Sequence, residues 1–163
     1  MCSQMILDKR MLVIVIVIAV VSVGAATYYY VFSPVIVEGV VDHKGITGEK
    51  DGTTYSILLN TPEGIIVKDE DYEQFFSEKD RDAFINETLD YKMRTEYSEI
   101  NYLVSIRVTS RDPTNNLEEN QTLAYFVSRE DFNALKMENR ITYEVERFQT
   151  ATIKRVLSIQ DRS

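Results

Sequence analysis

The sequence is poor in the residue types on which disulfide frameworks and metal centres depend. Its 163 residues include one cysteine, Cys2, and one histidine, His43. A single cysteine excludes an internal disulfide and a cysteine-rich zinc site. Tryptophan is absent, and there are only three prolines and six glycines. The chain must therefore be stabilised by a packed apolar core and not by covalent cross-links.

Charged side chains are missing from one long segment. Residues 11–37 contain none. A helix rises 1.5 Å per residue, so a helix over residues 11–32 would be about 33 Å long, enough to cross a hydrocarbon core. Tyrosines at residues 28–30 would lie where aromatic rings favour the lipid headgroups, and Pro34 would end the helix. The pattern predicts a single transmembrane helix, a signal anchor, at residues 11–32, and hence the lipid bilayer as one partner.

The charges beside this segment predict its orientation. Lys9 and Arg10 precede it, and no comparable group of cations follows it. The positive-inside tendency then leaves residues 1–10 in the cytoplasm and places residues 33–163 outside the cell membrane as an extracytoplasmic domain. The alternative is a cleaved signal peptide with its cleavage site at Gly24–Ala26. The apolar segment continues past those small residues, which favours a retained anchor.

Residues 33–163 carry an excess of acidic side chains. The whole chain has 26 acidic and 18 basic residues, and only Asp8, Lys9 and Arg10 lie before this segment. The domain therefore has 26 − 1 = 25 acidic and 18 − 2 = 16 basic residues, a net charge of −9. Phosphate backbones would repel such a domain, so no nucleic-acid partner is predicted.

Alternating apolar residues predict that the domain is rich in antiparallel strands. The clearest period of two runs from Ile100 to Val108, which is typical of a strand with one face in a core. A closing hairpin is expected across Gln149 and Thr150. The predicted strands are residues 35–41, 55–59, 65–67, 100–108, 123–127, 141–145 and 153–159.

Two helices are predicted between these strands. The first covers about residues 69–93, with a break at Ser77, where Ser77 and Asp80 match a capping box. The second is short and begins at Ser128, with Asp131 completing its capping box. The sequence therefore predicts an α+β domain, mainly a small antiparallel β-barrel with two short covering helices. Its element order resembles the OB-fold in architecture, with an extra hairpin and helix inserted.

Two parts of the domain resemble each other. Residues 67–75 match 127–135 at an offset of 60, and residues 55–59 match 104–108 at an offset of 49. The difference of 11 fits a longer hairpin loop, residues 112–120, in the second part. Both parts would run strand, hairpin, strand, capped helix, which predicts an internal duplication. The alternative is that capped helices follow strands for physical reasons alone.

Few residues are candidates for a functional site. His43, at the predicted end of the first strand, is the candidate cofactor-binding residue, as a haem or metal ligand at the barrel mouth. Asn120, in a polar loop, and Asn86, in the first predicted helix, begin glycosylation motifs. Tyr91 and Tyr97 are candidates for an exposed binding surface.

Other clusters of polar or small residues have simpler explanations. Gly45 and Gly48 are expected in a loop after the first strand, with Asp51–Gly52 as its turn, because a strand follows where a phosphate-binding loop would need a helix. Acidic residues at 69–71 are expected to stabilise a helix N-terminus. Apart from His43 as a candidate ligand, no catalytic residue, metal site or cofactor is predicted.

The leading hypothesis is a single-pass membrane protein whose extracytoplasmic domain is a non-catalytic binding or assembly module with a protein partner. A first alternative is a carrier of haem or metal that uses His43. A second is a carboxylate-dependent hydrolase, because 25 acidic residues always offer pairs of acids, although nothing in the sequence distinguishes one pair.

Overall fold

The computed structural model describes residues 9–66, 69–76, 82–112, 116–146 and 149–161. The chain divides into two compact units, Met1–Ser33 and Pro34–Ser163.

The first unit is helix α1, Lys9–Phe32. Its apolar side chains are exposed from Met11 to Tyr30, between 49% at Leu12 and 77% at Tyr29. A helix that is apolar on all sides requires an apolar environment. Within the described residues, α1 is the one helix long and apolar enough, over Met11–Phe32, to cross a membrane, a test that a signal sequence also passes. The predicted apolar helix is confirmed. The Tyr29 carbonyl oxygen accepts hydrogen bonds from both N and Oγ of Ser33 at its end.

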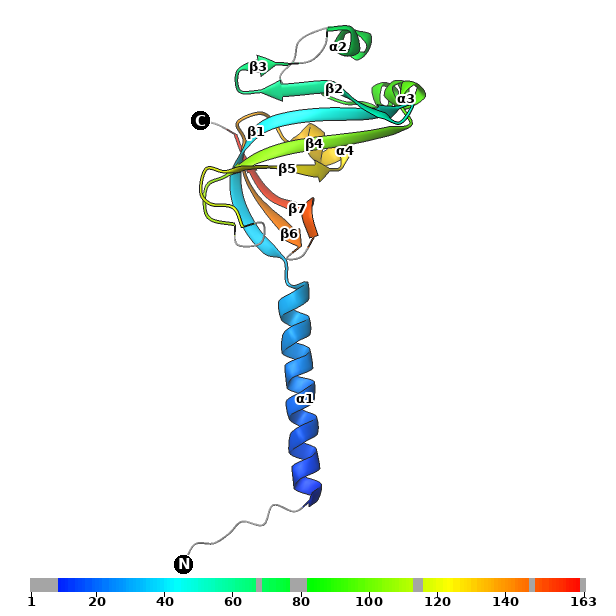
Figure 1. The fold of residues 1–163 in the computed structure, drawn as a ribbon. Coiled ribbons are helices and arrows are strands. Elements are labelled where there is room, and N and C mark those ends of the chain that lie inside the picture. Colours follow the sequence, from blue (N-terminus) through cyan, green and yellow to red (C-terminus); the bar gives the residue numbers. More distant parts are fainter. Residues whose placement is uncertain (1–8, 67–68, 77–81, 113–115, 147–148, 162–163) are drawn as a thin grey trace, which may run out of the picture. The chain divides into compact units, whose positions relative to one another are not determined.

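The second unit is built on one sheet of seven strands, nearly all antiparallel, in the order β3-β2-β1-β4-β5-β7-β6 (Figure 1). Three short helices accompany it. The strands are β1 Val35–Lys50, β2 Thr53–Thr61, β3 Gly64–Ile65, β4 Glu99–Val108, β5 Thr122–Val127, β6 Arg140–Glu146 and β7 Gln149–Gln160; the helices are α2 Asp69–Phe75, α3 Glu87–Glu96 and α4 Arg129–Ala134.

Strand β1 organises the sheet because it pairs with three others. Its first part, Val35–Val40, pairs with β6, and its later part pairs with β4 on one side and β2 on the other. The pairings continue from β4 to β5, β7 and β6 and so return to β1. The β5–β7 pairing is parallel, at Phe126 and Thr152. A bulge between Val41 and His43 accompanies the bend of β1, which is visible as the long cyan strand in Figure 1.

The buried face of the sheet follows the predicted alternation. In β4 every second residue is buried, as the period of two requires. Tyr143 Oη donates a hydrogen bond of 3.2 Å to Tyr125 Oη inside this core. The fully buried side chains include Val41, Ile46, Ile57, Val104, Ile106, Tyr125, Phe132, Leu135 and Tyr143.

The prediction of a glycine-bearing loop after the first strand was wrong. Gly45 and Gly48 lie inside β1, which continues to Lys50, and only the turn at Asp51–Gly52 is as expected. Gly48 is required by packing, because a Cβ there would lie 2.5 Å from Cγ of the buried Tyr97 ring. Gly48 thus allows the Tyr97 ring to approach the backbone of β1 closely.

The predicted helical stretch over residues 69–93 is divided into two helices, and the second begins well after the break expected at Ser77. Helix α2 ends at Phe75, and α3 begins only after Asn86, which is its N-cap and accepts a hydrogen bond from the Leu89 backbone N–H at 2.8 Å. The predicted capping box at Ser77 and Asp80 lies outside the described residues. The domain has three short helices among the described residues where two were expected.

Helix α4 matches its prediction closely. Ser128 is the N-cap, accepting from the Asp131 backbone N–H and donating to its carboxylate. Phe132 and Leu135 are fully buried, as the predicted apolar stripe requires. The closing hairpin is present as β6–β7, but Gln149 already pairs with Glu146, so the chain reverses before the residues expected at the turn.

Candidate functional site

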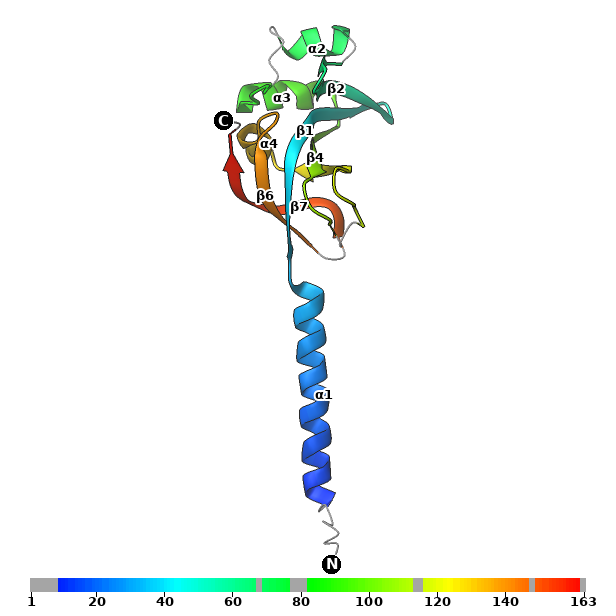
Figure 2. The ribbon, with the colours of Figure 1, turned by 90° about the vertical axis from the view of Figure 1, so that its left-hand side faces the viewer.

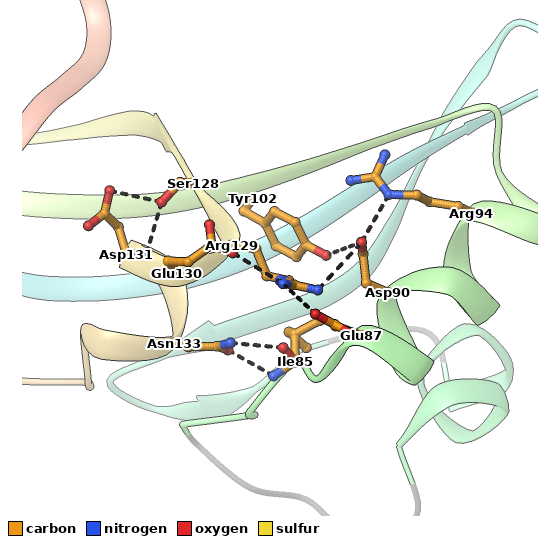
Figure 3. A network of polar contacts seen from close by, with 10 residues as sticks. All are labelled: Ile85, Glu87, Asp90, Arg94, Tyr102, Ser128, Arg129, Glu130, Asp131 and Asn133. Atoms are coloured by element: carbon orange, nitrogen blue, oxygen red, sulfur yellow. Dashed lines mark hydrogen bonds and ion pairs between the residues drawn. The ribbon is translucent and has the colours of Figure 1, made fainter.

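Four charged and polar residues from three elements meet beside β4 (Figure 3). Asp90 on α3 lies between Arg94 on one side and Tyr102 and Arg129 on the other. Tyr102 Oη donates a hydrogen bond of 2.6 Å to Asp90 Oδ1, and Arg94 Nε donates to both carboxylate oxygens, at 3.0 and 3.1 Å. Arg129 Nη1 lies 3.9 Å from Asp90 Oδ2. We call these four residues the Asp90 cluster.

The helix caps and one side-chain contact hold α3 and α4 in place for this cluster. The caps at Asn86 and Ser128 fix where α3 and α4 begin. The Asn133 side chain exchanges two hydrogen bonds, each of 2.8 Å, with the backbone of Ile85, and so joins α4 to the segment before α3. Figure 2 shows the two helices next to each other. The positions of the charged groups therefore depend on contacts far apart in the sequence.

The surroundings shift the pKa values of the two acidic groups in opposite directions. Burial disfavours the charged form of Asp90, but hydrogen bonds from Tyr102 and Arg94 and the charges of Arg94 and Arg129 outweigh it, so the pKa of this carboxyl is below its ordinary value. Burial, and next the Asp90 carboxylate, raise the pKa of the Tyr102 hydroxyl. Tyr102 is therefore a neutral hydrogen-bond donor and Asp90 an ionised acceptor at neutral pH.

A pocket of about 450 Å³ opens beside this cluster. Phe126 at the end of β5 is one of its walls and is 47% exposed. The pocket thus combines guanidinium groups with an accessible aromatic ring, a combination that is common in protein interfaces. The other residues lining this Asp90 pocket are Ile100, Asn101, Val127, Ser128 and Glu130.

A second pocket, of about 490 Å³, lies over the bulge of β1. Val40 on β1 pairs with Arg107 of β4 on one side and with Arg140 of β6 on the other. The two arginines therefore lie on the strands that flank β1 at this pocket. Carboxylates of Asp42, Glu138 and Asp161 also line it, giving this bulge pocket more acids than arginines.

His43 lies next to the bulge pocket, beside Asp42. Its Nδ1 is 3.6 Å from Asp42 Oδ2, and it has no hydrogen-bond partner among the described residues. Arg107 Nε, at 3.6 Å, and Thr122 Oγ1, at 3.4 Å, share the same Asp42 carboxylate. Among the described residues no group of three His, Cys, Asp or Glu side chains is placed to hold a metal ion.

The two glycosylation candidates differ in their surroundings. The side chain of Asn86 caps α3, and Asn86 precedes that helix instead of lying within it as predicted. Asn120 is exposed in the turn between β4 and β5, with a φ of 68°. Both side chains are exposed, and glycosylation would modify Nδ2, whereas the cap of α3 uses Oδ1 of Asn86. Of the two tyrosines expected on the surface, Tyr91 is 72% exposed, but Tyr97 is only 5% exposed and belongs to the core.

The acids of the bulge pocket are held by other groups. Asp42 faces Arg107, and Asp161 Oδ1 accepts a hydrogen bond of 3.0 Å from Asn139 Nδ2.

The Asp90 cluster was not predicted from the sequence. One local pattern could have indicated part of it, because Asp90 and Arg94 have the i, i+4 spacing of a helical ion pair.

Comparison of the chain with family models, with curated proteins and with solved structures finds no match.

Proposed function

We propose that the chain is a single-pass membrane protein, with a cytoplasmic N-terminus and an extracytoplasmic domain that binds a protein partner without catalysing a reaction. The apolar surface of α1 supports the anchor, and Lys9 and Arg10 before it support the orientation. The net charge of −9 derived above makes a nucleic acid an unfavourable partner.

The domain is proposed to be an OB-like barrel. An OB-fold is a five-stranded, partly open Greek-key barrel. The cycle of pairings β1–β4–β5–β7–β6, with α4 between β5 and β6, supports this assignment. Strands β2 and β3 with α2 and α3 are then an insertion between the first two barrel strands. The order β2, β3, α2 repeats as β4, β5, α4, which supports the proposed duplication.

The location of the partner site follows from this assignment. OB-folds bind oligonucleotides and oligosaccharides across the face of their second and third strands, which here correspond to β4 and β5, and we propose that the protein partner uses the same face. The observation that carries the proposal is the Asp90 pocket, where the exposed Phe126 ring lies beside two arginines at the end of these strands. Phenylalanine and arginine are among the residue types that are enriched in protein interfaces.

Site-specific photo-crosslinking in intact membranes tests the proposal. A benzoylphenylalanine in place of Phe126 is expected to give a discrete protein adduct, because its ring would lie in the interface. Ile66 is the control position: it is 58% exposed but follows β3, which is separated from β5 by β2, β1 and β4, or about 19 Å across the sheet. Adduct formation at Phe126 should disappear in an Arg129→Gln variant. Equal labelling at the two positions, or none at Phe126, would contradict the proposed site.

The contacts observed in the structure support the carrier and hydrolase alternatives less well. The carrier depends on His43, whose described neighbours offer no second and third metal ligand. The hydrolase depends on the acids of the bulge pocket, where an arginine already faces Asp42 at 3.6 Å. Titration with haem or zinc that leaves the spectrum and the melting temperature unchanged would exclude the carrier.

A further inference from the structure

The charges of the Asp90 cluster do not balance. Arg94 and Arg129 are opposed within the cluster by Asp90 alone. Two further acids approach Arg129, Glu130 at 3.1 Å and Glu87 at 4.0 Å, but their side chains are 73% and 91% exposed. Ion pairs of such exposed groups contribute little because water and salt screen them. Arg94 therefore depends on the Asp90 carboxylate, which it shares with Arg129.

Part of the Arg94 guanidinium does not contact Asp90 and is available at the pocket. Its contacts to Asp90 are made through Nε, and its two Nη groups point away from Asp90 in Figure 3. The side chain is 49% exposed and lines the Asp90 pocket. A guanidinium edge with two parallel N–H groups fits a carboxylate in bidentate geometry. The contact with Asp90 fixes the plane of this group before any ligand arrives.

An apolar contact lies next to the charged one. The Phe126 ring, 47% exposed, and the partly buried Val127 line the same pocket as Arg94. A ligand that places a carboxylate on Arg94 would therefore bring its neighbouring side chain to an aromatic surface. We propose that the Asp90 pocket binds a peptide carboxylate of the partner together with an adjacent apolar side chain, which packs on Phe126. This inference rests on the proposed function and adds the chemistry by which the partner is recognised.

A single carboxylate suits the pocket better than a more highly charged group. Two carboxylates, Asp90 and Glu130, already line the pocket beside the two arginines, and the domain as a whole has the net charge of −9 derived above, so a polyanion would be repelled. The carboxylate can come from a chain terminus or from an acidic side chain, because both present the same two oxygens.

Matched dipeptide probes test the inference on the full-length chain in detergent micelles. The first pair is acetyl-Gly-Phe with a free carboxylate and its C-terminal amide. The second is acetyl-Glu-Phe-amide and acetyl-Gln-Phe-amide. Within each pair only the negative charge differs, and the two pairs distinguish a terminal from a side-chain carboxylate. Binding is measured by saturation-transfer NMR titration.

We expect the charged member of at least one pair to bind about tenfold more tightly than its neutral twin, as for a charge-assisted bidentate contact. Arg94→Gln should remove this preference, and Phe126→Ala should weaken both members of the pair alike. Arg155→Gln is the matched control, because Arg155 is 66% exposed on β7 and pairs with Glu144. Circular dichroism establishes that each variant is folded.

Equal binding within both pairs, or a preference for the charge that Arg94→Gln leaves intact, would overturn the inference. If photo-crosslinking at Phe126 still captures the partner in that case, the proposed function stands and only the carboxylate chemistry is wrong. If the charged probes are preferred but Phe126 forms no adduct in membranes, the proposed protein-binding function fails instead.

Discussion

The same residue types have opposite surroundings in the two units of the chain. In α1, Val13 is 58% exposed and Ile18 60% exposed, whereas in the domain Val41 and Ile106 are completely buried. The domain supplies its own apolar environment through its sheet. Helix α1 must obtain one from outside, and a bilayer offers it along the full length of the helix.

The glycines show the same contrast. A Cβ at Gly24 in α1 would meet no atom within 4 Å, whereas a Cβ at Gly48 in β1 would collide with the Tyr97 ring. Packing thus constrains the sequence of the domain residue by residue. In α1 the constraint falls on overall apolarity.

Charges placed in α1 should have the largest effect. Replacing Val17 and Ile18 together with arginine is expected to cost about 5–7 kcal/mol of membrane insertion, from about 2.5–3.5 kcal/mol per charge at a helix centre. The measurement is the fraction of the chain that stays in the membrane pellet after alkaline carbonate extraction, with the double leucine variant as control. Retention of the arginine variant at the level of the control would contradict the inference that α1 requires an apolar environment from outside the chain.

A glycine-to-alanine substitution in each unit tests the same contrast, with a smaller expected effect on stability. Gly48→Ala should destabilise the domain by about 1–3 kcal/mol, because the new Cβ overlaps a buried ring that cannot easily move. Gly24→Ala, with open space around it, should leave the domain's stability unchanged. Urea unfolding followed by circular dichroism checks both variants. Equal midpoints for the two would show that the approach of Gly48 to Tyr97 is not as tight as described.

The Asp90 cluster should respond to acid. Because the folded pKa of Asp90 is lowered, its stabilising contribution is present above its ordinary pKa of 3.8 and disappears as pH falls below that value. Asp90→Asn is expected to cost about 1–2 kcal/mol at pH 7. The difference from wild type should shrink as pH falls further below 3.8. A difference that is constant with pH would mean that the carboxylate charge has no part in the stability of the cluster.

Removing the Tyr102 hydroxyl should have the smallest effect. Tyr102→Phe deletes the 2.6 Å hydrogen bond to Asp90 and is expected to cost about 1 kcal/mol at neutral pH. Since the folded pKa of Tyr102 is raised, its contribution is fully present below its ordinary pKa of 10.0 and is lost as pH rises above it. The two proteins should therefore converge in stability at alkaline pH. Divergence there would contradict the assigned donor role.

Local patterns predicted those parts of the fold that depend on neighbours in sequence. The alternation in β4 and the N-cap at Ser128 each arise from contacts within a few residues, and both are present. The extension of β1 through Gly45 and Gly48 could not be predicted, because it depends on pairing with β2 and β4 and, at Gly48, on the Tyr97 ring, which are distant in sequence.

The candidate site was beyond local reasoning for the same reason. Asp90 and Arg94 are one helical turn apart, but Tyr102 reaches Asp90 only because of where β4 lies beside α3. Arg129 joins them from α4, about forty positions further along the chain. His43 was a candidate because it is the single histidine of the chain. That fact does not determine which residues surround it in the fold.

The most direct test of the account is the accessibility of the intact chain to protease in whole cells, with an epitope at the N-terminus. We predict that external protease removes residues 34–163 and leaves an N-terminal fragment that pellets with membranes, while a cytosolic marker stays intact. Recovery of the full-length chain in the soluble cytosolic fraction, untouched until the cells are lysed, would contradict both the anchor and the external location of the binding domain.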